Sequence, residues 1–163
     1  MKKEGIAIVP GSFDPITNGH LYIIQNAAAS FEKVYVAVMI NDQKQYMFTL
    51  EEREEIARVC LSDMDNVTVI SSRGWLWELA RDLGASAIVK GYRNETDLEY
   101  ENKMAIFNKE HYPKADTILL KADDGLKTLS STVVRQRLNS LESLDGLVPT
   151  KAIEYIKKIT PKN

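Results

Sequence analysis

The segment 11–20 combines residue types that bind phosphate with a spacing that brings them to one turn. It reads Gly-Ser-Phe-Asp-Pro-Ile-Thr-Asn-Gly-His, follows the apolar run 6–9 and precedes an apolar-periodic stretch. This order predicts a strand, a glycine-containing turn and a helix, and the free N–H groups of a helix's first turn bind anions. Taken singly, Gly11 and Gly19 are equally typical of a tight turn, and His20 of an ordinary helix start. Together they predict a nucleotide or phosphate site.

A second group of candidate residues follows an apolar run at 87–89. Lys90 and Arg93 flank Gly91 and Tyr92. Arginine offers a two-pronged hydrogen-bond donor to phosphate, and glycine lets a nucleotide lie against the backbone. The acidic run 95–101 that comes next is typical of a solvated helix start stabilised by the helix dipole. The cations before it favour polyphosphate binding.

Two further segments carry side chains suited to phosphate. The segment 130–135 reads Ser-Ser-Thr-Val-Val-Arg, and hydroxyls at a helix start both cap the helix and bind phosphate. Lys44 lies in the predicted loop 41–48, where a flexible ammonium group could follow a phosphate as its charge redistributes. A solvated loop lysine is the alternative interpretation.

Two common nucleotide motifs are missing from the chain. There is no G-x-G-x-x-G between the first predicted strand and helix, and no G-x-x-x-x-G-K-[ST] anywhere in the sequence. The chain therefore lacks the fingerprints of a dinucleotide-dependent dehydrogenase and of a P-loop nucleotide hydrolase.

Short apolar runs alternate with longer stretches of helical spacing, which predicts the elements that must position these residues. Continuously apolar strands joined by helices predict an α/β fold, a Rossmann-like doubly wound parallel sheet of about five strands with helices on both faces. Ligands of such sheets bind at the carboxyl ends of the strands, so the four segments should meet at one edge. The predicted strands are 5–9, 34–40, 67–70, 87–89 and 117–120, and the predicted helices are 19–31, 50–61, 76–83, 97–108, 131–138 and 150–158.

Length and composition fit one globular domain. The 163 residues, 44% of them hydrophobic, predict a single domain over 1–163 with a C-terminal helix at about 150–158. The net charge of −2 provides no basic field for a nucleic-acid backbone. The single cysteine, Cys60, excludes an intramolecular disulfide, and the apolar run 6–9 is too short for a signal peptide or a membrane span. We therefore expect a cytoplasmic protein without nucleic-acid or membrane partners.

Four segments together resemble the bacterial phosphopantetheine adenylyltransferases of the nucleotidyltransferase superfamily. The Thr-x-Gly-His pattern at 17–20 is similar to the superfamily's His-x-Gly-His loop, and the segment 130–135 to its Ser-Ser-Thr-x-x-Arg element. The segments 47–53 and 90–101 continue the likeness, which extends over about 6–149. The chain departs from the expected pattern at Ser12, where threonine is frequent, at Lys90, where arginine is frequent, and at Trp75, Lys103, Phe107 and Leu126.

The resemblance implies transfer of an adenylyl group from ATP to 4′-phosphopantetheine, giving dephospho-coenzyme A and pyrophosphate. It implies catalytic roles for His20, as a transition-state stabiliser, and for Lys44 and Arg93. An ionised phosphate needs no general base, so the work of the enzyme is alignment and charge stabilisation. The implied phosphopantetheine-binding residues are Ser12, Lys44, Leu76 and Lys90, and the implied ATP-binding residues are Ser12, Phe13, His20, Gly91, Tyr92, Arg93, Glu101, Leu126, Lys127, Thr128, Leu129, Ser130, Ser131 and Thr132.

The polyphosphate chemistry predicts Mg²⁺ bound mainly through ATP, since no cluster of carboxylates marks a dedicated protein site. The resemblance also implies a homohexamer, and product-like binding of coenzyme A in the same cleft, as an inhibitor, is a further hypothesis. Two alternatives stay open at this point. One is a sister nucleotidyltransferase acting on nicotinamide mononucleotide, glycerol phosphate or pantoate. The other is a module that binds adenine nucleotides or coenzyme A without turnover.

Overall fold

The structure, a computed structural model, describes residues 3–160 and contains one sheet of five parallel strands in the order β3-β2-β1-β4-β5. The order confirms the predicted doubly wound α/β architecture, because it reverses direction between β1 and β4. Ligand sites of this class of sheet lie at that reversal. The strands are β1 (Lys3–Gly11), β2 (Phe31–Met39), β3 (Val67–Ser72), β4 (Ala87–Tyr92) and β5 (Asp116–Lys121).

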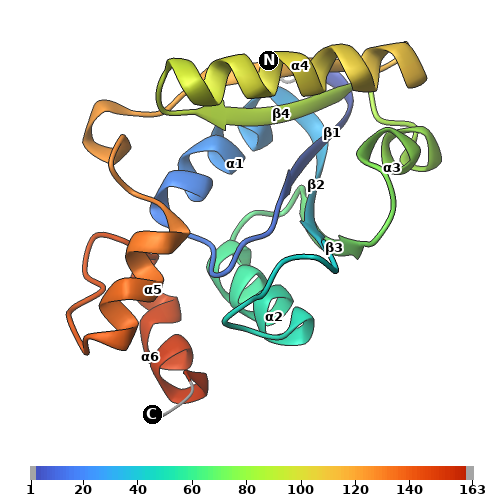
Figure 1. The fold of residues 1–163 in the computed structure, drawn as a ribbon. Helices are drawn as coiled ribbons and strands as arrows, with labels where there is room; N and C mark the ends of the chain where they lie inside the picture. The colour runs from blue at the N-terminus through green and yellow to red at the C-terminus, as the bar shows by residue number, and fades with distance from the viewer. Residues whose placement is uncertain (1–2, 161–163) are drawn as a thin grey trace.

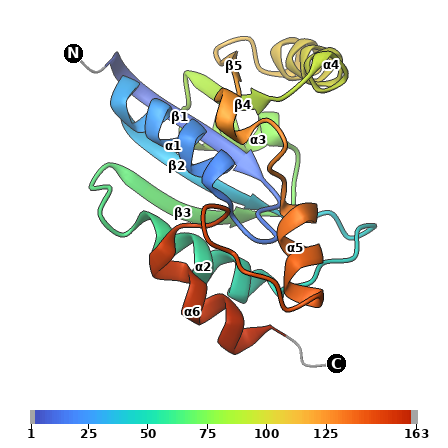
Figure 2. The same cartoon turned by 90° about the vertical axis from the view of Figure 1, so that its left-hand side faces the viewer.

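Helices cover both faces of the sheet, and α6 lies outside α2 (Figures 1 and 2). Side chains of β1 alternate between the faces: Ala7 and Val9 belong to the core under α1 and α2, and Ile8 to the core under α3. Both cores exclude water, which explains the continuous apolar runs of the sequence. The helices are α1 (Asn18–Ser30), α2 (Leu50–Leu61), α3 (Leu76–Leu83), α4 (Glu95–His111), α5 (Ser131–Asn139) and α6 (Thr150–Ile159), with a short 3₁₀ helix, η1 (Asp124–Leu126).

The C-terminal helices enlarge the first of these two cores. Leu144, Ala152 and Ile156 are fully buried in the cluster that also contains Val34 and Val36 of β2, and α6 packs against α2. The predicted helix at about 150–158 is thus part of the main core rather than an appendage.

The predicted limits of α2 and α3 match the structure. Local signals in the sequence set one end of each of these helices. In the sequence, Thr49 stands three positions before Glu52, which is the pattern of a capping box at a helix start. The structure forms that box: the Thr49 side chain accepts from the Glu52 N–H at 3.1 Å, and Glu52 accepts from the Thr49 N–H at 2.9 Å. Gly84 ends α3 with φ 65°, the left-handed conformation that glycine adopts readily.

The strands extend beyond their apolar residues, because ladder hydrogen bonds depend on the backbone rather than on side-chain polarity. The pairing of β4 with β5 continues from Val89 to Tyr92, so Lys90 and Gly91 lie in the strand and not in a loop after it. Phe31 begins β2 instead of ending α1. The 3₁₀ helix η1 had no predicted counterpart.

Cys60 lies on the buried side of α2, with 4% of its surface exposed. Burial raises the pKa of its thiol to about 12, with the charge of Lys151 opposing the shift, and only the thiolate is nucleophilic. We expect the native protein at pH 8 to leave Ellman's reagent unreacted and the protein in guanidinium to react with one equivalent. Rapid labelling of the native protein would contradict this burial.

No helix within residues 3–160 is both long and apolar enough to cross a membrane.

Candidate active site

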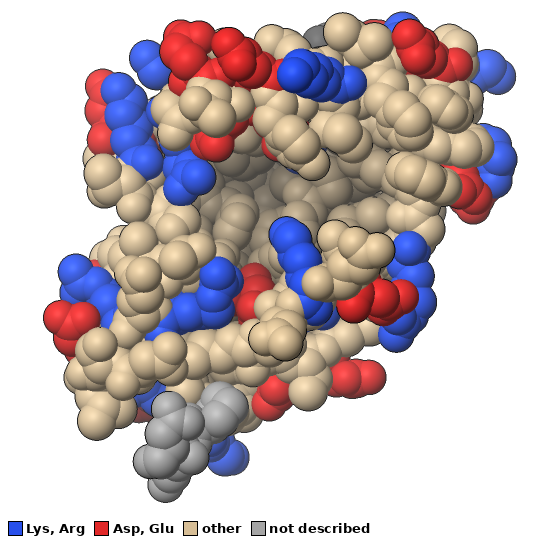
Figure 3. Space-filling model, in the orientation of Figure 1, with Lys and Arg blue, Asp and Glu red and all other residues tan. Residues whose placement is uncertain are grey.

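A cavity of about 320 Å³ lies where the strand order reverses. The ends of β1 and β4, the first turns of α1 and α5, and η1 line it. Figure 3 shows this face hollowed between α4 above and α5 below, with Lys and Arg side chains along the left and lower margins of the hollow. Eleven of the residues implied by the resemblance line the cavity: Phe13, His20, Lys90, Gly91, Tyr92, Arg93, Glu101, Leu126, Leu129, Ser130 and Ser131.

Thr17 and His20 form the capping box that begins α1. The Thr17 hydroxyl accepts from the His20 N–H at 3.4 Å, and the Thr17 N–H donates to Nδ1 of His20 at 3.0 Å. His20 thus takes the place that glutamate or glutamine usually has in this motif. Because Nδ1 accepts a hydrogen bond, the ring proton of neutral His20 resides on Nε2. The Thr-x-Gly-His pattern therefore supplies a neutral hydrogen-bond donor at the cavity.

Two effects keep His20 neutral. Burial of the imidazole, assisted by the charge of Arg93, lowers the pKa of His20 from 6.5 to about 4. Because the folded-state pKa lies below the unfolded value, the stability contributed by neutral His20 is complete above pH 6.5 and is lost as the pH falls toward 4. His20 and Arg93 line the same cavity.

An NMR titration tests this protonation state. The chain has only two histidines, His20 and His111, so His111→Ala leaves a single imidazole to follow. We expect its resonances to titrate with a midpoint near pH 4. A midpoint near the ordinary value of 6.5 would show that the fold does not favour the neutral ring, which would contradict the burial of His20 and its hydrogen bond from the Thr17 N–H, since a cationic ring cannot accept.

Phe13 packs against the ring of His20. Its side chain is buried and lies edge-on to the imidazole, with ring centroids 4.9 Å apart and an interplanar angle of 77°. A Cβ on Gly11 would lie 3.0 Å from the Phe13 ring, so a larger residue there would push that ring by a few tenths of an ångström. Phe13 itself has φ 48°, an uncommon left-handed conformation of the kind that collects at functional sites. Nothing in the sequence predicted it.

Both cations on the β4 side of the cavity are paired with carboxylates. Lys90 Nζ lies 2.6 Å from Glu101 Oε2, and Arg93 Nε lies 3.1 Å from Asp97 Oδ2. Asp97 also accepts from the Arg93 backbone N–H at 3.1 Å, so it contacts both the side chain and the backbone of Arg93. Sequence reasoning did not include Asp97, although an aspartate four residues after an arginine at a helix start was an available signal.

Gly91 has a packing role in addition to its predicted one. A Cβ at this position would lie 2.9 Å from Cδ1 of Ile23 on α1. The absence of a Cβ at Gly91 lets α1 approach β4, which brings the first turn of α1 and the end of β4 to the same cavity. The expectation that Gly91 lets a nucleotide lie against the backbone remains a prediction.

The hydroxyls at the start of α5 hold that helix in place. Ser130 caps α5 by accepting from the Val133 N–H at 3.2 Å, and Ser131 donates to the carbonyl of Pro15 at 2.8 Å. The second contact ties α5 to the turn after β1. Both residues line the cavity, so the capping and phosphate-binding interpretations are compatible here.

Lys44 is exposed in the loop between β2 and α2 and does not line the cavity. Buried Arg53 holds this loop at the same edge of the sheet. Its Nη1 donates to the carbonyl of Ser12 at 2.9 Å and to that of Met39 at 3.4 Å, and its guanidinium lies 3.9 Å from the centroid of the Tyr46 ring. Sequence reasoning did not single out Arg53.

Five other implied residues lie outside the lining of the cavity. Leu76 begins α3 and packs into the core on the far face of the sheet. Lys127 pairs with Asp124, and Thr132 Oγ1 accepts from Arg135. These five residues, none of them in the cavity wall, are Ser12, Leu76, Lys127, Thr128 and Thr132.

Two of the departures from the family pattern are in contact with each other. The rings of Trp75 and Phe107 have centroids 5.5 Å apart, and Trp75 precedes Leu76 at the start of α3. A bulky residue on α4 is thus matched by one at the start of α3.

Within residues 3–160 no three His, Cys, Asp or Glu side chains gather so that they could hold a metal ion.

A parallel doubly wound sheet with a cavity at its reversal point, lined by Lys90, Arg93 and their carboxylate partners, is the arrangement in which α/β proteins of the nucleotide-binding class hold their ligands. Comparison with known families agrees with this class. A family model described as cytidylyltransferase-like matches residues 8–137.

Several similar curated proteins carry the same name, and their alignments cover most of this chain. The phosphopantetheine adenylyltransferase of Shouchella clausii is 37% identical over 153 residues, which cover 94% of this chain and 96% of the relative. That of Clostridium tetani is 40% identical over the same shares, and that of Heliobacterium modesticaldum 44% identical over 80% of this chain and 78% of the relative. The chain belongs to the phosphopantetheine adenylyltransferase family.

Proposed function

We propose that the protein transfers the adenylyl group of ATP to 4′-phosphopantetheine. A phosphate oxygen of phosphopantetheine attacks the α-phosphorus of ATP, the bond from that phosphorus to the oxygen bridging the β-phosphate breaks, and pyrophosphate leaves. The product is dephospho-coenzyme A. The observation that carries the proposal is the cavity at the β1/β4 reversal, which is lined by His20, Lys90, Arg93 and the start of α5.

His20 acts in this proposal as a neutral donor rather than as an acid or base. Its Nε2–H would bind an oxygen of the α-phosphate, where negative charge increases in the transition state, because Nδ1 is occupied by the Thr17 N–H. A preorganised donor of this kind stabilises the transition state without rearrangement during the reaction.

Lys90 and Arg93 would bind phosphate after exchanging carboxylate partners. Their present partners, Glu101 and Asp97, line the same cavity. A polyphosphate offers more oxygens and more charge than one carboxylate, so its binding is expected to displace these pairs. Arg93 and Glu101 would then hold ATP, and Lys90 and Leu76 would contact phosphopantetheine.

Mg²⁺ enters the proposal as part of the nucleotide substrate. Mg²⁺ usually keeps several waters and binds through one or two carboxylates plus substrate phosphates. The carboxylates that line the cavity are those of Asp97, Glu101 and Asp123, and they are not gathered into one cluster. These residues therefore suit an ion that is bound mainly by ATP rather than one bound by protein ligands alone. When bound, the ion would neutralise charge on the leaving pyrophosphate.

An assay for product tests the proposal. Purified protein with ATP, Mg²⁺ and 4′-phosphopantetheine should form dephospho-coenzyme A and pyrophosphate in equal amounts, measured by chromatography with mass detection. Parallel reactions with nicotinamide mononucleotide, glycerol phosphate and pantoate should give no adenylylated product. Turnover of one of those three would favour the sister enzyme, and ATP binding without any turnover would favour a binding module.

The same proposal includes three further properties. They are a homohexameric assembly, inhibition by coenzyme A and a cytoplasmic location, and they rest on the family resemblance and on the composition. Light scattering should give a mass near six chains. Coenzyme A should raise the apparent KM for phosphopantetheine by competition, since it contains the same pantetheine and phosphate chemistry.

A further inference from the structure

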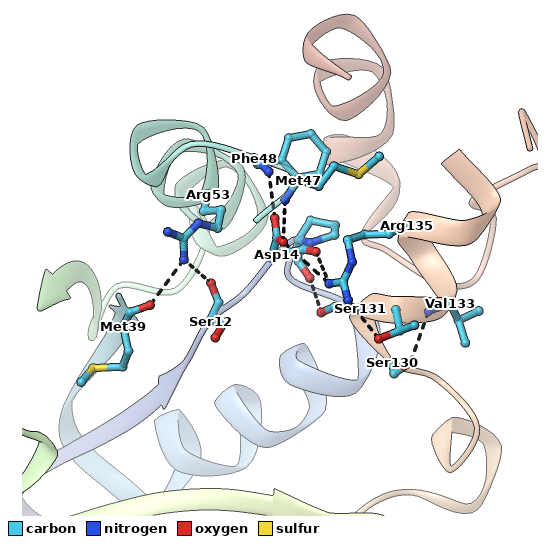
Figure 4. Close-up of polar contacts among 12 residues, drawn as sticks. Ser12, Asp14, Met39, Met47, Phe48, Arg53, Ser130, Ser131, Val133 and Arg135 are labelled. Carbon is cyan, nitrogen blue, oxygen red and sulfur yellow. Dashed lines mark hydrogen bonds and ion pairs between the residues drawn. The ribbon is translucent and has the colours of Figure 1, made fainter. Parts of the chain in front are cut away.

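Asp14 is a buried carboxylate that does not line the cavity. Only 4% of the residue is exposed. Its Oδ2 accepts from the Met47 N–H at 2.9 Å and its Oδ1 from the Phe48 N–H at 3.0 Å (Figure 4). These amides follow Lys44 by three and four residues, so Asp14 binds the loop that carries the lysine.

The same residue contacts α5 from its other side. Arg135 Nη1 donates to the Asp14 carbonyl at 2.8 Å and lies 3.8 Å from Oδ2, and its Nη2 donates to Thr132 Oγ1 at 3.0 Å. Figure 4 shows Asp14 between the Met47–Phe48 backbone and Arg135. Three segments distant in the sequence, namely the turn after β1, the loop before α2 and the start of α5, therefore meet at one side chain.

A buried carboxylate is unfavourable unless hydrogen bonds and a countercharge compensate for its lost hydration. Here two backbone N–H groups and the Arg135 guanidinium provide that compensation. The partners can do so only while the loop and α5 keep their positions relative to Asp14. A neutral side chain would remove this constraint.

We propose that Asp14 is a positioning residue that fixes the Lys44 loop relative to His20 and to the start of α5. The proposal rests on the proposed function and deepens it. Asp14 precedes His20 by six residues in the same turn and contacts no reacting group. It acts by setting the position of Lys44, proposed to bind phosphopantetheine, relative to His20 and the hydroxyls of α5, proposed to bind ATP.

The isosteric substitution Asp14→Asn tests this role. The amide keeps one oxygen for a backbone N–H but presents an NH₂ group to the other N–H. We expect a folded protein whose kcat/KM for phosphopantetheine falls about tenfold, which corresponds to the loss of one charge-assisted hydrogen bond. Asp65→Asn, an exposed site, serves as the matched control and should leave kcat/KM unchanged.

A double-mutant cycle with Lys44→Ala separates positioning from a general structural role. If Asp14 acts through the lysine, Asp14→Asn should cost much less in the Lys44→Ala background than in the wild type. Equal losses in both backgrounds, or an unchanged kcat/KM in folded Asp14→Asn, would overturn the proposal. Absence of adenylyl transfer by the wild-type protein would refute the proposed function instead. The wild-type assay gives that result before any variant is made.

A second variant keeps the test valid if Asp14→Asn does not fold. Arg135→Met removes the countercharge at a partly exposed site while leaving both amide contacts in place. Hydrogen exchange at the Met47 and Phe48 amides should then be faster than in Asp65→Asn, together with a lower kcat. Unchanged exchange and unchanged kcat would contradict the coupling between α5 and the Lys44 loop.

Discussion

Replacing His20 by alanine is expected to lower kcat for adenylyl transfer about a hundredfold to a thousandfold, the usual cost of removing one preorganised transition-state donor. The KM values for both substrates should change little, because the donor contributes most when charge builds on the α-phosphate. Steady-state kinetics at pH 7.5 with both substrates varied would measure the two effects separately.

Two variants separate the chemistry of His20 from its capping role. His20→Gln can still accept from the Thr17 N–H, as glutamine does in ordinary capping boxes, so it should fold like the wild type and yet show the same low kcat. His111→Ala removes the other histidine, on the exposed end of α4, and should keep wild-type kcat. Full activity of folded His20→Ala would remove His20 from the mechanism.

Replacing Lys44 by alanine is expected to lower kcat/KM for phosphopantetheine about tenfold to a hundredfold, the range for losing a charge-assisted hydrogen bond to phosphate. The side chain is exposed, so the free energy of unfolding should not change. Kinetics with phosphopantetheine varied at saturating ATP would show the loss. The effect on KM for ATP should be small, because Lys44 stands outside the cavity that His20 and Arg93 line.

The control for this substitution is Lys114→Ala. Lys114 is also exposed but precedes β5, at the amino edge of the sheet, and its removal should leave kcat/KM as in the wild type. Lys44→Arg should be intermediate, since it keeps the charge but changes the geometry of the donor. Equal kinetics for Lys44→Ala and wild type would exclude Lys44 from the substrate site.

The ion pairs of the cavity indicate how a slightly acidic protein binds a polyanion. Lys90 and Arg93 are held in place by Glu101 and Asp97 before any ligand arrives, so their side chains lose less conformational freedom on binding. The carboxylates lie where they could then contact the hydroxyl or amino groups of a nucleotide or the waters of its metal ion.

The sequence by itself determined the features that depend on near neighbours. Apolar runs joined by helical stretches predicted the parallel sheet, and the capping residues Thr49 and Gly84 predicted where α2 begins and α3 ends. The glycines and hydroxyls of 11–20 and 130–135 predicted helix starts able to bind phosphate. Each of these signals acts within one or two turns of chain, so local backbone chemistry was sufficient.

Only the tertiary structure decided which of these segments meet. Placing β1 beside β4 brings Arg93 and His20 to one cavity, and strand order follows from burial of long-range contacts rather than from local propensity. The carboxylate partner Asp97, the left-handed backbone of Phe13 and the contacts of Asp14 with Phe48 and Arg135 arise in the same way. They join residues as many as 121 positions apart, and no local pattern encodes which distant group will compensate a buried charge.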